Sequence, residues 1–460
     1  MDLNIKVTLL LLFILAVEFC FISNANFVLP VQRKFKVSHK NLTEIKAHDT
    51  RRHGRFLSAV DIEIGGNGLP SKTGLYYTKI GLGSPVKDFY VQVDTGSDIL
   101  WVNCGGCTTC PKKSGLGMEL HLYDSKDSTT SEVVPCDGDF CHATYEGQIS
   151  DCKQGKSCPY SIIYGDGGQT TGSFVKDLLT FNRVSGNLHT GPDNSSIVFG
   201  CGSKQTGSLG KPDDDALGGI MGFGQSNSSM LSQLAASGKC VWFLSLFGST
   251  NLIQWAHYNV VLKDVEVDGD LLQLPLDIFD SGNGRGTIID SGTTLVYLPP
   301  MIHSQLVSKI LARQPTLKLY LVEDEFTCFQ YSDKLDDGFP LVKFHFDGIS
   351  LIAYPHDYLF YYRDDMYCIG WQKSSSQTKD GKDLILLGDL VLSNKLVVYD
   401  LENMEIGWTD FNCSSSIKVK DDKTGSVYAV GAHQLNSAST VLIGIVLPFF
   451  LLLIIAMITV

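Results

Sequence analysis

The sequence is short of basic charge. Its 460 residues include 37 lysines and arginines against 49 aspartates and glutamates, a formal net charge of −12 at pH 7. Nucleic-acid binding depends on basic side chains that neutralise phosphates, so this balance argues against nucleic acid as a partner. An acidic surface by itself most often serves solubility and identifies no other partner.

Recognisable metal-site and nucleophile motifs are also missing. None of the 11 histidines lies in a His-Glu-x-x-His pattern, which argues against metallopeptidase and serine-hydrolase chemistry. Cys104, Cys107 and Cys110 have the spacing of half a zinc knuckle, but no second Cys or His pair follows nearby at ligand spacing. We therefore expect disulfides here, and no metal or other cofactor.

Helical patterns are few, with residues 230–237 and 300–312 as the best candidates. From about Gly74 to residue 411, apolar β-branched and aromatic runs alternate with turn residues, as in 75–82 and 88–93. A chain of this length exceeds a single ordinary core. The sequence therefore predicts a mostly β protein with two lobes.

The amino terminus has the pattern of a secretory signal peptide over residues 1–25. Lys6 precedes an apolar run at 7–17, and small residues follow at 23–25. A signal anchor would need a longer apolar run. Export to an oxidising compartment would make disulfides of the 12 cysteines that follow Cys20. In that context four sequons are candidate glycosylation sites, at Asn41, Asn194, Asn227 and Asn412.

The carboxyl terminus carries a second apolar segment. Residues 441–460 contain no charge and are long enough to span a bilayer. Small residues precede them at 431–432 and 436–439. This pattern favours a GPI-attachment signal at 441–460 after a linker at 414–440, with a plain tail anchor as the alternative. The mature protein would then be held by lipid at the outer face of the plasma membrane.

Residues 27–55 stand apart in charge. They carry eight basic and two acidic side chains, a net charge of +6, whereas the chain from Phe56 onward sums to −17. We interpret residues 26–72 as a basic prosegment that could plug a carboxylate-lined cleft. A solvated linker is the alternative.

An internal repeat is the main organisational signal. Val-Gln-Val-Asp-Thr-Gly-Ser at 91–97 returns in kind as Thr-Ile-Ile-Asp-Ser-Gly-Thr at 287–293. Each copy is followed by an apolar pair and a glycine, which end at Gly222 and Gly388. The first half is longer and holds most of the extra cysteines. Two related lobes, each presenting one aspartate from a strand end, explain this pattern.

Such Asp turns can perform acid–base chemistry. Glycine permits the tight turn, and the neighbouring hydroxyls and amides can orient the carboxylate. Two such turns facing each other would bring together Asp94 and Asp290, which would share one proton because both cannot stay ionised. One could then act as a base on a water while the other protonates a carbonyl oxygen. One Asp-Thr-Gly alone would be a weak signal.

These motifs resemble those of the pepsin-type aspartic proteases, over about Gly74 to Cys413. Phe89-x4-Asp-Thr-Gly-Ser-x3-Trp101 resembles the first catalytic motif of that family, and Ile288-Ile-Asp-Ser-Gly-Thr-Thr294 resembles the second. The resemblance implies a mostly β, bilobal fold, with an N-terminal lobe at 73–250, a C-terminal lobe at 251–413 and an active-site cleft between them. It also implies a monomer that acts on protein or peptide substrates.

The resemblance implies roles for several residues. Asp94 and Asp290 would be catalytic, and Ile163-Tyr-Gly-Asp-Gly167 would be a flap hairpin whose Tyr164 closes over substrate and contacts Trp101. The apolar-apolar-Gly segments would support each aspartate, with Asp389 as a structural hydrogen-bonding residue. The other expected substrate-binding residues are Gly96, Ser97, Gly292 and Thr293.

Within the family the chain resembles the plant nepenthesin-like group, because of its Cys-rich first-lobe insertion, and that group's GPI-anchored members. The resemblance suggests disulfides between Cys328 and Cys368 and between Cys201 and Cys413. Two features depart from the pattern. Gly168 replaces a serine after the flap motif, which predicts a looser hairpin. An apolar run at 241–247 replaces a Gly-rich strand segment of roughly twenty residues.

The leading prediction is therefore a secreted, GPI-anchored aspartic endopeptidase that is active at acidic pH. The alternative is a catalytically impaired member of the same fold that acts as a cell-surface binding module. A structural glycoprotein would leave the duplicated Asp turns unexplained.

Overall fold

The computed structural model describes most residues between 60 and 430. Every described residue belongs to one compact unit, Arg55–Val460. The expected signal peptide, most of the prosegment, the run at 241–247 and the apolar C-terminal segment lie outside the described residues. The described residues are 60–62, 64–67, 70, 74–147, 149–186, 189–210, 216–237, 249–253, 257–275, 286–374, 384–401, 403–413, 415–420 and 427–430. Within them, no helix combines the length and apolarity needed to cross a bilayer.

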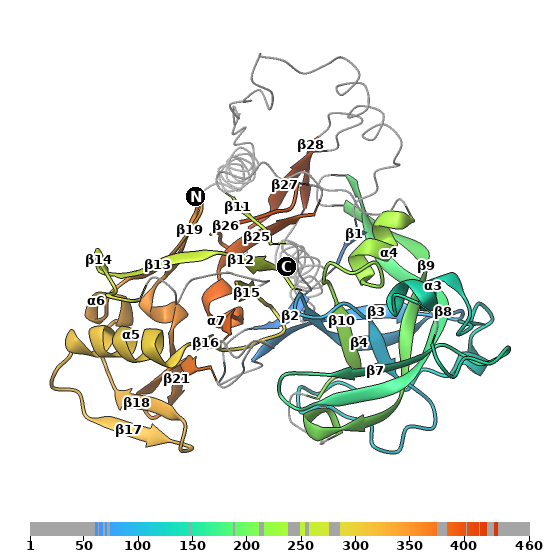
Figure 1. The fold of residues 1–460 in the computed structure, drawn as a ribbon, viewed down its shortest axis with the longest axis horizontal. Coiled ribbons are helices and arrows are strands. Elements are labelled where there is room, and N and C mark those ends of the chain that lie inside the picture. Colours follow the sequence, from blue (N-terminus) through green and yellow to red (C-terminus); the bar gives the residue numbers. More distant parts are fainter. Residues whose placement is uncertain are drawn as a thin grey trace, which may run out of the picture. The chain divides into compact units, whose positions relative to one another are not determined.

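The N-terminal lobe is built on one ten-stranded sheet, coloured blue to green in Figure 1. Its main path runs β1-β8-β9-β5-β10-β4-β3-β2, β6 and β7 pair with β8, and β8 also pairs with β3. The strands are β1 (Val60–Asp61), β2 (Ile64–Asn67), β3 (Leu75–Leu82), β4 (Lys87–Asp94), β5 (Trp101–Asn103), β6 (Glu132–Val133), β7 (Pro159–Ile163), β8 (Gln169–Gly186), β9 (His189–Thr206) and β10 (Gly219–Gly222). Short helices are η1 (Ser125–Asp127), α3 (Asp139–Thr144), η2 (Gly207–Gly210) and α4 (Met230–Ala236).

The C-terminal lobe contains three sheets of its own. Their orders are β12-β15-β24-β16-β23, β14-β13-β19-β20 and β17-β18-β22-β21. The strands are β12 (Asn259–Val260), β13 (Leu262–Val267), β14 (Asp270–Leu271), β15 (Thr287–Ile289), β16 (Val296–Leu298), β17 (Leu319–Val322), β18 (Phe326–Gln330), β19 (Val342–Phe346), β20 (Ser350–Ala353), β21 (Leu359–Arg363), β22 (Met366–Ile369), β23 (Trp371–Lys373) and β24 (Ile385–Leu387). The helices are α5 (Pro300–Ala312), α6 (Leu335–Gly338), η4 (Pro355–Asp357) and α7 (Asp389–Leu392).

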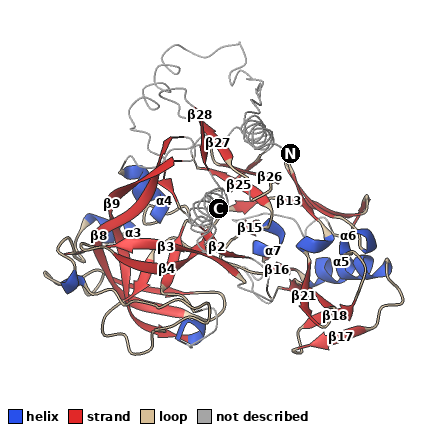
Figure 2. Ribbon diagram, turned by 180° about the vertical axis from the view of Figure 1, so that it is seen from behind, coloured by secondary structure: helices blue, strands red, loops and turns tan. Residues whose placement is uncertain are grey.

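Strands dominate both lobes, as Figure 2 shows, which confirms the expected mostly β, bilobal fold. The reason is visible in β4, where Phe89 and Val91 are buried at alternate positions and Tyr90 between them is only half-buried. The two expected helices are confirmed as α4 and α5. Helix α5 begins with Pro300 and buries Ile302, Leu306 and Ile310 along one face.

The repeat in the sequence is a repeat in structure. In the N-terminal lobe β10 lies parallel to β4 and antiparallel to β5, with Gly222 opposite Asp94. In the C-terminal lobe β24 lies parallel to β15 and antiparallel to β16, with Leu387 opposite Ile289. Each apolar-apolar-Gly segment therefore pairs with the strand that delivers an aspartate.

Two further groups of strands complete the chain. One is a sheet of β11 (Thr250–Asn251), β26 (Glu405–Asp410) and β25 (Lys395–Asp400). The other is a hairpin of β27 (Ile417–Lys420) and β28 (Val427–Val430), in which Val419 and Val430 are buried. The hairpin falls inside the expected linker at 414–440, so this part of the linker is folded, and β28 lies against β8.

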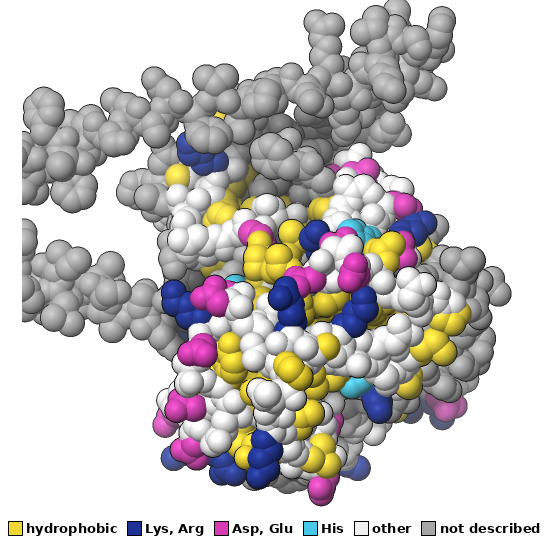
Figure 3. All heavy atoms as spheres, turned by 90° about the vertical axis from the view of Figure 1, so that its left-hand side faces the viewer, with side chains coloured by type: hydrophobic (Ala, Val, Ile, Leu, Met, Phe, Trp, Pro, Cys, Tyr) yellow, Lys and Arg dark blue, Asp and Glu magenta, His cyan; other side chains and the backbone are white. Residues whose placement is uncertain are grey.

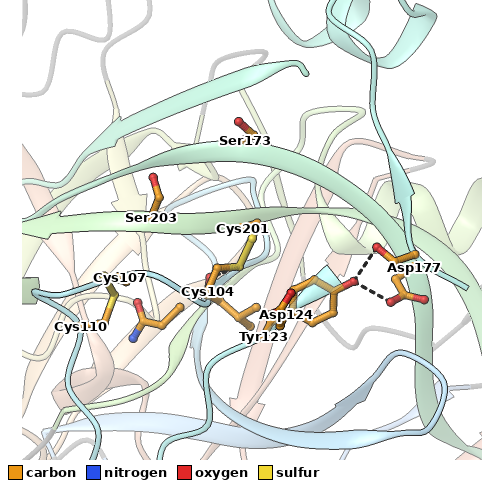
Figure 4. The surroundings of a disulfide bond; sticks show 12 residues. Cys104, Cys107, Cys110, Tyr123, Asp124, Ser173, Asp177, Cys201 and Ser203 are labelled. Carbon is orange, nitrogen blue, oxygen red and sulfur yellow. Dashed lines mark hydrogen bonds between the residues drawn. A yellow bond between two sulfur atoms is a disulfide. The ribbon is translucent and has the colours of Figure 1, made fainter. Parts of the chain in front are cut away.

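The disulfide pattern corrects one expectation. Cys201 pairs with Cys104, not with Cys413, which is exposed and free. The reason is the parallel pairing of β5 with β9, which sets Val102 opposite Cys201 and brings Cys104 alongside (Figure 4). The expected Cys328–Cys368 bridge is confirmed. The other bridges are Cys107–Cys110, Cys136–Cys152 and Cys141–Cys158.

The Cys104–Cys201 disulfide lies beside a buried polar contact (Figure 4). Tyr123 donates a hydrogen bond to Asp177 Oδ2 at 2.7 Å (Figure 4), and its ring packs edge-on against Phe199. A buried carboxylate needs such donors to offset its desolvation. The Cys-rich insertion is therefore attached to the main sheet by a covalent bond and by hydrogen bonds.

Candidate active site

Asp94 is the last residue of β4 and is 5% exposed. The turn that follows supplies two donors to its carboxylate. The amide of Gly96 donates to Oδ1 at 2.8 Å, and the hydroxyl of Ser97 donates to Oδ2. Because both oxygens are held, the carboxylate has one orientation.

Asp290 has the same surroundings in the other lobe. It follows β15 and is 9% exposed. The amide of Gly292 donates to Oδ1 and the hydroxyl of Thr293 donates to Oδ2, each at 2.7 Å. Ser97 and Thr293 thus make equivalent contacts, as expected from the repeat.

Reciprocal hydrogen bonds join the two turns. The amide of Thr95 donates to Ser291 Oγ at 3.2 Å, and the amide of Ser291 donates to Thr95 Oγ1 at 2.9 Å. The hydroxyl of Ser291 in turn donates to the carbonyl of Val93 at 3.3 Å. These bonds fix the position of one aspartate relative to the other.

The glycines leave room for the facing carboxylates. A Cβ atom on Gly96 would lie 2.5 Å from Asp290 Oδ1, and one on Gly292 would lie 2.1 Å from Asp94 Oδ1. Both distances are shorter than any real contact, so a side chain at either position would force the pair apart. Each lobe's glycine therefore makes space for the other lobe's aspartate.

The two carboxyl groups interact strongly. Burial, followed by the negative charge of Asp290, raises the pKa of Asp94 to about 7, although hydrogen bonds from Ser97 and Gly96 act in the opposite direction. The pair also makes a direct hydrogen bond. Such a pair holds one proton between its members across the acidic range.

Asp389 makes a structural hydrogen bond through its backbone. Its amide donates to the carbonyl of Thr293, in the second Asp turn, at 2.8 Å. The side chain is 1% exposed, and its Oδ2 has no hydrogen-bond partner among the described residues. Burial and the charges of Asp290 and Asp94 raise its pKa well above the usual range. The sequence singled out Asp389 by its place after Leu-Leu-Gly, but it did not predict that the carboxyl is buried beside the pair.

The flap hairpin lies over the Asp94 turn. Trp101 Nε1 donates to the hydroxyl of Tyr164 at 2.7 Å, so the expected contact is present. The Tyr164 hydroxyl also interacts with Ser97, which itself binds Asp94. The flap tip is therefore linked to a catalytic candidate through one side chain.

Hydrogen bonds close the flap turn on both sides of Gly168, and the looser hairpin expected from this glycine stays a prediction. The amide of Tyr164 donates to the carbonyl of Gly168 at 2.8 Å, and the amide of Gly168 donates to Asp166 Oδ1 at 2.8 Å. Gly167, between them, has a φ of 81°, which glycine adopts without strain. The turn is closed by hydrogen bonds on both sides.

Surface charge shows no basic patch in the view of Figure 3, where acidic and basic side chains of the C-terminal lobe are interspersed. Several of them form ion pairs, such as Lys263 with Asp347 at 3.2 Å. A metal site is not evident either, since the described part of the chain has no cluster of three His, Cys, Asp or Glu side chains suited to one.

Comparison with known proteins places this geometry in a family. Residues 76–248 match the family model described as "Xylanase inhibitor N-terminal", and residues 257–410 match "Xylanase inhibitor C-terminal". Aspartic proteinase 36 of Arabidopsis thaliana is 49% identical over 450 residues, covering 93% of this chain and 92% of the relative. Aspartic proteinase 39 of the same plant is 48% identical, covering 94% and 93%.

More distant proteins agree on the fold. Aspartic proteinase nepenthesin-1 of Nepenthes gracilis is 27% identical, covering 82% of this chain and 89% of the relative. The crystal structure of edgp superposes with a TM-score of 0.59 at 15% identity, covering 76% of this chain and 94% of that one. The relatives at nearly half identity, over almost their whole length, show that this chain belongs to the pepsin-like aspartic proteinase family.

Proposed function

We propose that the protein is an endopeptidase that hydrolyses peptide bonds with a water activated between Asp94 and Asp290. The observation that carries the proposal is the mutual placement of the two carboxyls, each oriented by an amide and a hydroxyl and each given room by the opposite glycine. Burying two carboxyls against each other costs folding free energy, and such pairs with perturbed pKa values are found mainly at functional sites.

The mechanism follows from one shared proton. The pair holds that proton jointly, and we write the step with Asp94 as the acid and Asp290 as the base. A water between them loses a proton to Asp290 and its oxygen bonds to the peptide carbonyl carbon, while Asp94 protonates the carbonyl oxygen. The tetrahedral diol then collapses. Its C–N bond breaks, the amine nitrogen takes the proton from Asp290, and a hydroxyl proton returns to Asp94.

Substrate binding is proposed for the groups around the pair. Tyr164 and Trp101 would cover the peptide from the flap side, where their hydrogen bond preorganises the flap. Gly96 and Gly292 expose backbone that an extended peptide can approach, and Ser97 and Thr293 hold the carboxylates while it binds. No cofactor is needed for this chemistry.

The proposed setting is extracellular. A signal peptide at 1–25 and a GPI signal at 441–460 would place a monomeric, glycosylated enzyme on the outer face of the plasma membrane. The sequon asparagines Asn194, Asn227 and Asn412 are exposed, which glycosylation requires. Phosphatidylinositol-specific phospholipase C should release the protein from intact cells, whereas retention with a tag after Val460 would indicate a tail anchor.

A catalytically impaired binding module is the second candidate, because the matching family models are described as xylanase inhibitor domains. Cleavage of denatured haemoglobin or casein at mildly acidic pH, with and without a statine-type inhibitor, separates the two. Inhibitor-sensitive cleavage supports the endopeptidase. No cleavage by the correctly folded protein, down to the pH at which it unfolds, supports the binding module.

A further inference from the structure

The tip of the flap contacts a second element, the short helix η2. Strand β8 begins at Gln169, directly after the flap turn, and pairs with Thr206 at the end of β9. Helix η2 (Gly207–Gly210) starts one residue later. The register of β8 on β9 therefore brings η2 against the flap turn.

One carboxylate joins the two elements. The hydroxyl of Ser208 in η2 donates to Asp166 Oδ2 at 2.6 Å. The other oxygen of Asp166 accepts the amide of Gly168, which closes the flap turn. Asp166 thus shapes the turn with one oxygen and binds η2 with the other.

Glycines on both sides permit this close approach. A Cβ atom on Gly168 would lie 2.5 Å from Ser208 Oγ and 3.0 Å from Leu209 Cγ. A Cβ atom on Gly207 would lie 2.1 Å from the carbonyl oxygen of Gly167. A side chain at position 168 would therefore require Ser208 to move from its present place against the flap turn.

Helix η2 also shares an apolar cluster with the flap. Leu209 is partly buried against the cluster that contains Trp101, and Tyr164 packs on the same cluster. Helix η2 therefore binds the flap turn through Ser208 and rests on the cluster that the flap tyrosine also covers.

We propose that η2 is a latch: Ser208, through Asp166, holds the flap seated on Trp101 and controls how often the flap lifts to admit or release a peptide. Ser208 is a positioning residue, because it reaches the site only through the flap. The exchange of peptides is part of this inference and rests on the proposed peptidase function, whereas the lifting of the flap can be measured without catalysis.

The expected effect of unlatching is specific. Loss of one hydrogen bond of this kind should raise the lifted fraction about fivefold. A peptide passes through the lifted state when it enters and when it leaves. Both rate constants should therefore rise by about the same factor, while the dissociation constant stays nearly unchanged. A residue that contacted the peptide directly would change the dissociation constant instead.

The experiment compares Ser208→Ala with Ser208→Thr, which keeps the donor, and with Ser203→Ala. Ser203 is the matched control, because its hydroxyl makes an exposed hydrogen bond from β9 to the carbonyl of Thr171, away from the flap tip. Stopped-flow binding of a fluorescent statine-containing peptide should be about fivefold faster in both directions for Ser208→Ala. The other two variants should behave like the wild type.

Hydrogen exchange of the Trp101 indole gives a second readout that needs no peptide. Its N–H is protected by Tyr164 while the flap is seated and can be followed by NMR with ¹⁵N-tryptophan, assigned with Trp101→Phe. Exchange should be faster in Ser208→Ala and in Gly168→Ala, whose Cβ displaces η2. Unchanged exchange in both would overturn the latch, even in an active enzyme. Faster exchange in a protein without protease activity would leave the latch standing and remove the proposed function.

Discussion

Replacing Asp94 by Asn should have opposite effects on stability and on activity. The pKa of Asp94 is about 7 in the folded protein against an ordinary 3.8. The folded state therefore binds more protons than the unfolded state between these two values, and the free energy of unfolding falls as the pH rises through that window. The full difference, about 3 pKa units, corresponds to about 4 kcal/mol of destabilisation above pH 7.

Asparagine removes that penalty, because it stays neutral. Its amide oxygen can still accept the Gly96 amide, and the hydroxyl of Ser97 can rotate to accept from the new NH2 group. We therefore expect Asp94→Asn to unfold at a higher temperature than the wild type at pH 8 and at nearly the same temperature at pH 4. Activity should fall by several orders of magnitude, since the pair acts as a unit.

The assay is thermal unfolding at pH 4 and pH 8 together with casein cleavage at acidic pH. Asp88→Asn is the control, because Asp88 lies on the same strand but is exposed and pairs only with Lys79 at the surface. That variant should resemble the wild type in both measurements. Near-normal proteolysis by purified Asp94→Asn would remove the carboxyl pair from the mechanism. A stability gain that is equal at both pH values would show that the pKa of Asp94 is not raised in the folded protein.

Three further predictions concern groups around the pair. Tyr164→Phe removes the acceptor of the Trp101 N–H and should lower kcat/KM about tenfold without changing the melting temperature by more than a few degrees, which paired kinetics and calorimetry will show. Asp389→Asn should leave activity at acidic pH intact, because the raised pKa keeps that carboxyl neutral there. The alkaline limb of the pH–rate profile should also stay in place, since a carboxyl that remains neutral puts no charge on the pair; a shifted limb would show that Asp389 ionises with the pair. A protein that starts at Asn26 should become active only below about pH 5, whereas one that starts at Phe56, which keeps β1 and β2, should also cleave at pH 7; equal activity at pH 7 would make the basic segment a linker.

The parts of the fold that were predictable are those encoded by local pattern and by duplication. The spacing of apolar residues in the sequence predicts both the alternating burial along β4 and the buried face of α5. The two Asp turns were recognisable because each contains its own amide and hydroxyl donors within three residues. Their facing arrangement followed from the repeat.

Contacts set by long-range register were not predictable. Cys201 lies 97 residues from its partner Cys104, and only the pairing of β5 with β9 selects that partner over the other cysteines. The hairpin of β27 and β28 was taken for linker because each strand has only four residues. Such short strands need a neighbouring element such as β8, against which β28 lies, and a single-sequence pattern does not record that neighbour.

The flap illustrates how one residue can change meaning between the two levels. Read alone, Gly168 predicts a looser turn, because glycine costs the folded chain entropy. In the structure the missing Cβ is the space that Ser208 and Leu209 occupy. The order that a side chain at this position would have provided is thus supplied by contacts from another element. That element lies forty residues further along the chain, and the pairing of β8 with β9 brings it to the flap. The sign of a glycine substitution therefore depends on what fills the space left by its side chain, and here a second element fills it.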